Sequence, residues 1–329
     1  MPVALALVPV AAALACAAVI LTLLRRPEWL PLDRPNERSL HEVPVPRIGG
    51  IGIVAGVLLA FALLRAEPLL AVLFAALALV SFLDDRSHLP VVARFAAHGL
   101  AAAVFVLIAL PELPALWQAA AALAIMWMTN LYNFMDGSDG LAGGMALFGF
   151  AAYALGGWLA GDAVLCTLAA SVAAAATAFL AFNFPPARVF MGDAGAIPLG
   201  FLAATVGLLG WREGYWPFWF PILVFSPFAL DATVTLARRA VRRERLWEAH
   251  KTHYYQRLVR LGWGHRNTAL AEYALMAACG AVALWALGES TAVQWIALAV
   301  MAVIYLALAA AVDSAWRRRN AVQSDAAAH

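Results

Sequence analysis

Apolar residues occur along this chain in long runs that short polar segments separate. Nine runs lie at or near the roughly 17 to 25 residues that a helix needs to cross a bilayer, at 3–24, 48–64, 91–110, 115–128, 141–159, 163–182, 215–236, 268–287 and 292–312. Two shorter runs, 69–83 and 194–209, bring the expected number to eleven. Roughly 15 helical residues make only about 22 Å, so we expect these two helices to leave Asp84 and Asp193 in the headgroup layer.

The composition agrees with this pattern. Hydrophobic residues make up 64% of the 329 residues and charged residues 13%, which excludes an ordinary soluble domain. The three cysteines lack paired spacing, which indicates small buried residues rather than disulfides or metal ligands. We therefore predict an all-α, polytopic membrane protein with one transmembrane domain over residues 1–316 and a short cytoplasmic tail over 317–329.

Lysine and arginine set the expected orientation, because loops rich in them stay in the cytoplasm. When alternate loops are counted, 20 of the 22 basic residues fall on one side, and Arg65 and Arg212 fall on the other. The sequence thus predicts a periplasmic N-terminus, a cytoplasmic C-terminus and polar segments that face the cytoplasm.

Three acidic clusters lie at the ends of apolar runs on this predicted cytoplasmic face. They contain Asp84 and Asp85, then Asp136 and Asp139, and finally Asp193. Ionisable residues at membrane depth usually mark functional sites. The pattern therefore predicts one pocket for a metal ion and phosphate groups.

Neighbouring polar residues refine this expectation. Asn130 and Asn133 are three residues apart and share a helix face, ahead of a turn that Gly137 and Gly140 open. Asp84 and Asp85 point about 100° apart on a helix, so one could act in chemistry while the other orients. The alternative is a helix-end charge that Arg86 or Arg94 pairs.

A basic element near the C-terminus contains His250, Lys251 and His253 within four residues, a density that suits phosphate binding. A zinc site formed by His250 and His253 is the alternative, but no HExxH pattern or cysteine accompanies this pair. Asp231 lies inside a predicted span, as a coupling residue of a transporter would, and we expect it to pair with Arg238 or with an arginine of a neighbouring helix.

Taken together, three segments carry a combination of motifs that is highly specific. They are Asp84-Asp85, Asn130-x-x-Asn133-x-x-Asp136-Gly137-x-Asp139-Gly140-Leu141 and Asn183-x-Pro185-Pro186-x-x-x-Phe190-Met191-Gly192-Asp193-Ala194-Gly195. Over nearly the whole chain the sequence resembles the polyprenyl-phosphate N-acetylhexosamine-1-phosphate transferases of glycosyltransferase family 4. This resemblance implies transfer of a sugar 1-phosphate from a UDP-sugar to undecaprenyl phosphate, release of UMP, and Mg²⁺ as cofactor, with Mn²⁺ as a substitute.

The resemblance also assigns roles to residues. It implies that Asp193 and Asn133 hold the metal, that Asp84 and Asp85 handle the lipid phosphate, and that Asp136 and Asp139 serve the nucleotide. With the basic residues included, we expect a catalytic set of Asp84, Asp85, His250 and His253, and a substrate-binding set of Arg47, Asn130, Asp136, Asp139 and Lys251. Whether Asp84 or Asp85 is base, nucleophile or orienting group does not follow from sequence.

Within the family, His250-Lys251-Thr252-His253 and Asp33-Arg34-Pro35-Asn36 look like the bacterial enzymes that start O-antigen and related polymers in the inner membrane. The peptidoglycan branch, which uses UDP-muramoyl-pentapeptide, carries three consecutive histidines where Lys251 and Thr252 intervene here. We expect the bilayer, a UDP-N-acetylhexosamine and undecaprenyl phosphate as partners, and no nucleic acid. The sugar, among GlcNAc, FucNAc and QuiNAc, and a homodimer stay open.

Overall fold

The computed structural model describes residues 3–26, 31–33, 35, 44–87, 89–245 and 250–327, with the side chains of 3, 4 and 322–327 left aside. A short antiparallel ribbon of β1 (Leu32–Asp33) and β2 (Val45–Pro46) accompanies the helices of this described part. They are α1 (Val3–Leu24), α2 (Gly49–Leu64), α3 (Pro68–Ser87), α4 (Val91–Ala109), α5 (Ala115–Met135), α6 (Leu141–Leu159), α7 (Ala163–Asn183), α8 (Asp193–Arg212), α9 (Trp219–Val224), α10 (Ser226–Val241), α11 (Tyr254–Leu258), the π-helical turn η2 (Val259–Trp263), α12 (Gly264–Ala286) and α13 (Thr291–Ala327).

These helices confirm an all-α polytopic membrane protein. In the described part of the chain, eight helical segments are long and apolar enough to cross a membrane. The count of eleven spans stays a prediction, and two of its details are wrong. The runs at 69–83 and 194–209 belong to α3 and α8, each of 20 residues, or about 30 Å of helix, so neither is short. The run at 215–236 breaks at Phe225 into α9 and α10.

Helix α8 lies at the centre of the bundle, where α2, α3 and α5 pack against it. Small residues let these neighbours approach closely. A Cβ atom added to Gly200 would lie 2.7 Å from the Met128 carbonyl oxygen of α5, a distance that steric repulsion forbids. Close backbone packing of this kind is how helices associate where water supplies no driving force, and it fixes the first residue of α8, Asp193, against the end of α5.

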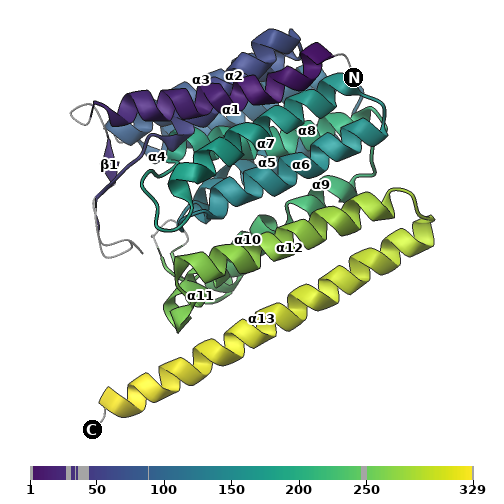
Figure 1. The fold of residues 1–329 in the computed structure, drawn as a ribbon. Coiled ribbons are helices and arrows are strands. Elements are labelled where there is room, and N and C mark those ends of the chain that lie inside the picture. The colour runs from purple at the N-terminus through teal and green to yellow at the C-terminus, as the bar shows by residue number, and fades with distance from the viewer. Residues whose placement is uncertain are drawn as a thin grey trace.

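The polar connections gather at one end of the bundle. Strand β1 and helix α11 lie at the end where α1 finishes, and the C-terminal end of α13 reaches the same side (Figure 1). The amides of Gly49 and Gly50 donate to the carbonyls of Phe190 and Met191, which places the start of α8 there as well. The long helix α13 diverges from the rest of the bundle and continues past Trp316. The boundary drawn between residues 316 and 317 therefore falls inside one helix, and this division of the chain stays a prediction.

Cysteine labelling from the two membrane sides tests the predicted orientation. Single cysteines at Ser138 and Thr252 should react with an impermeant maleimide only from the cytoplasmic side, because the basic loops lie there. A cysteine at the exposed Ser290, at the opposite end of the bundle, should react only from the periplasmic side. Labelling of Ser138 and Thr252 from the periplasm alone would invert the topology.

Candidate functional site

The end of α3 and the start of α8 bring two acidic clusters together. Asp84, which is buried, accepts hydrogen bonds from the Leu89 amide at 2.7 Å and from Arg94 Nη1 at 3.0 Å. The same Nη1 lies 3.9 Å from Asp193 Oδ2. Arg94 of α4 thus contacts carboxylates that are more than 100 residues apart in sequence. Arg86, the other candidate partner of Asp84, instead lies over the Phe82 ring.

Asp85, the next residue of α3, contacts the start of α8 and Arg47. Its Oδ2 accepts from the Ala194 amide at 3.2 Å, at the start of α8, and its Oδ1 lies 3.6 Å from Arg47 Nη1. Arg47 also pairs with Asp33 of β1 at 3.0 Å. The side chain of Asp85 is only 3% exposed, so its charge depends on these partners. Arg34 and Asn36, which neighbour Asp33 in the sequence, lie outside the described residues.

A backbone contact holds Arg47 in place. Arg47 forms an isolated parallel bridge with Phe190, and the Gly50 amide donates to the Met191 carbonyl at 2.9 Å. A Cβ atom on Gly50 would lie 2.3 Å from the Gly195 amide nitrogen, so this close approach requires glycine. Residues 46–50 and the loop before α8 therefore form one wall of the site.

The end of α5 supplies the third acidic cluster. Asp136 accepts a hydrogen bond from the Gly192 amide and lies near the charges of Asp193 and Asp85. Burial, and then the negative charge of Asp193, raise the pKa of Asp136 well above its ordinary value. Asn133, one turn earlier, hydrogen-bonds Asp193. The four carboxylates at residues 84, 85, 136 and 193 thus converge, as predicted, and they outnumber the guanidinium groups of Arg47 and Arg94 found among them in the described structure.

Two predicted substrate ligands have other contacts. Asn130 donates to the Met126 carbonyl of its own helix at 2.7 Å and interacts with His98 of α4. Asp139 accepts from the Ala187 amide at 2.9 Å. Both residues therefore stabilise the local structure through these hydrogen bonds. Their predicted roles in substrate binding stay predictions.

His253 of the basic element is held by Asp231. Asp231 Oδ1 lies 3.2 Å from His253 Nδ1 and accepts from the Tyr254 amide at 2.9 Å, while Oδ2 accepts from the Tyr255 amide at 3.1 Å. The prediction that an arginine pairs with Asp231 is therefore wrong. The carboxylate instead accepts from the first amides of α11, where helix geometry leaves donors without partners in the helix, and it orients the imidazole.

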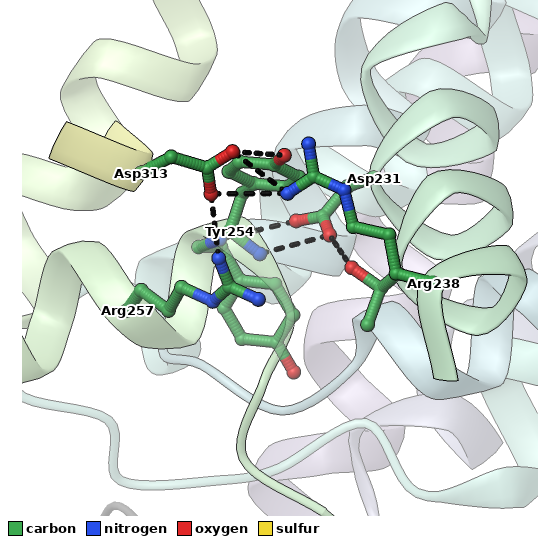
Figure 2. Close-up of polar contacts among 7 residues, drawn as sticks. Asp231, Arg238, Tyr254, Arg257 and Asp313 are labelled. Atoms are coloured by element: carbon green, nitrogen blue, oxygen red, sulfur yellow. Dashed lines mark hydrogen bonds and ion pairs between the residues drawn. The ribbon is translucent and has the colours of Figure 1, made fainter. Parts of the chain in front are cut away.

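Arg238 has a different partner (Figure 2). Its Nη1 lies 2.8 Å from Asp313 Oδ2 of α13, and Arg257 Nη1 of α11 lies 2.8 Å from Asp313 Oδ1. Both guanidinium groups stack on the Tyr254 ring, at 5.4 and 5.1 Å from its centroid. One carboxylate of α13 thus ties α10 and α11 together next to His253.

The other members of the basic element surround His253. The rings of His250 and His253 stack with centroids 4.8 Å apart, and Thr252 Oγ1 lies 2.8 Å from His250 Nδ1. Burial, followed by the charge of His253, lowers the pKa of His250 to about 4. His250 is therefore neutral at pH 7, and its Nδ1 hydrogen-bonds with the Thr252 hydroxyl. The carbonyl oxygen of Lys251 accepts from Arg260, and the predicted binding roles of Lys251 and His250 stay predictions.

The fit of a metal ion can be judged from the donors present. In the described residues, no three His, Cys, Asp or Glu side chains form a metal-binding group. Magnesium commonly takes one or two protein carboxylates and completes its shell with water and phosphate oxygens. Asp193 and its neighbour Asn133 offer hard oxygen donors of this kind, so the residues fit Mg²⁺ held jointly with a substrate phosphate.

Several residues of this site were not found from sequence. The sequence suggests Arg94 only as an alternative partner of Asp84 and gives no signal for its contact with Asp193. It predicts an arginine as the partner of Asp231, where the structure has His253. His265, which contacts Ser138 at 2.9 Å, gave no signal beyond its position in a basic loop.

Comparison with known proteins agrees with this geometry. A family model described as "Glycosyl transferase family 4" matches residues 68–210. A probable undecaprenyl-phosphate N-acetylglucosaminyl 1-phosphate transferase of Bacillus subtilis is 30% identical over 74% of this chain and 73% of the relative. A decaprenyl-phosphate N-acetylglucosaminephosphotransferase of Mycobacterium tuberculosis is 29% identical over 73% and 71%. A phospho-N-acetylmuramoyl-pentapeptide-transferase of Staphylococcus aureus is 29% identical over 48% of each chain.

The acidic clusters meet at one end of the helical bundle, and the structure places Arg47 and Arg94 among them. The chain belongs to glycosyl transferase family 4, among the polyprenyl-phosphate hexosamine-1-phosphate transferases. The predicted resemblance is confirmed.

Proposed function

We propose that the protein transfers an N-acetylhexosamine 1-phosphate from a UDP-sugar to undecaprenyl phosphate and releases UMP. The observation that carries this proposal is the convergence of Asp84, Asp85, Asp136 and Asp193 beside Arg47 and Arg94. The product would be the first lipid-linked sugar of O-antigen or of another cell-surface polysaccharide. The names of the similar bacterial enzymes, which act on polyprenyl phosphates, support the acceptor class.

The reaction exchanges one phosphoanhydride for another. An oxygen of the lipid phosphate forms a bond to the sugar-bearing phosphorus of the UDP-sugar, and the bond from that phosphorus to the bridging oxygen breaks, so UMP leaves with the electron pair. The lipid phosphate is largely dianionic at pH 7, because the second pKa of a phosphate monoester is near 6. The barrier therefore lies mainly in bringing anions together, and no ATP is required.

The site offers specific groups for this task. Arg94 Nε is buried without a hydrogen-bond partner among the described residues, and a phosphate oxygen would satisfy it. Asp84 and Asp85 lie at the end of a predicted span, where a lipid phosphate would enter. His253, fixed by Asp231, offers its second ring nitrogen to a phosphate oxygen. Bound Mg²⁺, with Mn²⁺ as a substitute, would supply electrostatic stabilisation of the pyrophosphate near Asp193 and Asn133.

An assay of donors with purified protein in lipid nanodiscs tests this proposal. UMP release should require both undecaprenyl phosphate and a UDP-N-acetylhexosamine, with GlcNAc, FucNAc and QuiNAc donors compared and UDP-muramoyl-pentapeptide inactive. Radiolabel from the sugar-linked phosphate should enter the lipid extract. A transporter would move substrate without new covalent product, so label that stays in the aqueous phase with every donor would contradict the proposal.

A further inference from the structure

The loop that carries Asp136 and Asp139 is held by side chains from the C-terminal part of the chain. Tyr255 Oη donates to the Phe134 carbonyl at 3.2 Å, just before the loop, and Tyr273 Oη donates to the Gly140 carbonyl at 2.7 Å, at its end. Gly140 has a φ of +78°, so the chain turns sharply there. The two tyrosines thus hold both ends of a five-residue turn.

His265 binds the middle of the same loop. Its Nδ1 lies 2.9 Å from Ser138 Oγ and accepts from the Asp139 amide at 3.3 Å. Because the backbone N–H must donate, Nδ1 carries no proton and the Ser138 hydroxyl donates to it as well. Of the Asp139 carboxylate, Oδ2 accepts from the Ala187 amide at 2.9 Å, and Oδ1 lies 3.7 Å from His265 Nδ1, beyond hydrogen-bond distance. One ring nitrogen therefore satisfies two donors of adjacent residues.

The local chain conformation directs His265 toward the loop. Gly262 and Gly264, with φ values of +102° and +67°, form the bend between η2 and α12. These backbone conformations suit glycine alone without strain. His265 and Asp139 also line an open hollow of about 400 Å³, together with Trp263 and Pro185. The contact thus lies at a surface that a ligand can reach.

We propose that His265 is a positioning residue, whose Nδ1 fixes the Ser138–Asp139 peptide and so sets the Asp136–Gly140 loop for the UDP-sugar. The inference rests on the proposed function for the identity of the substrate. His265 is not a catalytic residue in this proposal, since its contacts are with the loop. The His265 side chain links α12 to the end of α5, two segments that are more than 100 residues apart in the sequence.

The test compares two substitutions that differ in one acceptor. His265→Phe keeps a flat ring and removes the acceptor Nδ1. His265→Asn replaces Nδ1 with another acceptor, Oδ1, which is the same number of bonds from Cβ. His265→Phe should lower kcat/KM for the UDP-sugar by about tenfold to a hundredfold, as expected for the loss of two hydrogen bonds, mainly through KM. KM for undecaprenyl phosphate should stay unchanged. His265→Asn should recover most of the loss, and Asn267→Ala, exposed on the same helix, should behave as wild type.

Hydrogen exchange separates positioning from the chemistry. Amide exchange of peptides covering 136–140 should be about tenfold faster in His265→Phe and near normal in His265→Asn. If His265→Phe does not fold, Ser138→Ala removes one of the two donors and should give a smaller change of the same kind. Unchanged exchange or an unchanged KM for the UDP-sugar in the folded variants would overturn the inference. Absence of UMP release by wild type would instead refute the proposed function, and exchange would still decide the role of His265.

Discussion

Asp193→Asn should lower sugar-phosphate transfer by about a thousandfold or more, with the folded yield preserved. Asp193 is the first residue of α8, beside Asn133, Arg94 and Asp136. In the proposed function it is the main anionic ligand of Mg²⁺, and loss of such an ion removes several kcal/mol of charge stabilisation, with each 1.36 kcal/mol worth about tenfold in rate. Asparagine keeps the shape of the side chain and one oxygen donor, so packing should change little.

UMP release should be measured over a range of Mg²⁺ concentrations, together with thermal unfolding. Asp162→Asn is a matched control, because Asp162 caps α7 at the opposite end of the bundle and asparagine caps helices as well as aspartate does. This control should turn over normally. Near-normal turnover of Asp193→Asn at saturating Mg²⁺ would contradict the metal assignment.

His253→Ala should lower transfer by about tenfold or more, the effect of losing one charge-assisted contact of roughly 1.5 to 3 kcal/mol. Asp231 holds Nδ1 of this ring at 3.2 Å, which leaves Nε2 to the substrate. His253→Gln can place a hydrogen-bonding group near Nε2 and should retain more activity than His253→Ala. Arg317→Ala removes an exposed charge from α13 and should leave transfer unchanged.

Asp231→Asn should impair both turnover and stability, because the same carboxylate also accepts from the Tyr254 and Tyr255 amides. An amide group has one acceptor oxygen in place of two, so one of the two backbone amides at the start of α11 would lose its hydrogen-bond partner.

The zinc content of the purified protein decides between the phosphate-binding and the zinc-binding interpretation of His250 and His253. Purified wild type should contain no stoichiometric zinc, and stoichiometric zinc that disappears in His253→Ala would overturn the phosphate-binding role.

The convergence of the acidic clusters could be predicted because hydropathy fixes helix ends, and alternate ends of spanning helices meet on one side. Asp84, Asp136 and Asp193 follow from this rule. The partner of Asp231 could not be found in this way, since its contacts depend on how α11 folds back. The break at Phe225 was missed because the apolar run continues through it. Hydropathy alone predicts a shorter α3, because the apolar run ends before Asp84 and Asp85, but the helix continues to Ser87.

The hydrogen bonds of Tyr255, His265 and Tyr273 with the Asp136–Gly140 loop have a consequence for biosynthesis. The loop is synthesised early, but the three side chains that hold it are made more than 100 residues later. A nascent chain that has inserted α1 to α8 already carries all four clustered carboxylates, without the histidines and tyrosines that complete the site. We therefore expect the enzyme to become active only after α12 has left the ribosome and docked, so that partly synthesised chains cannot consume UDP-sugar.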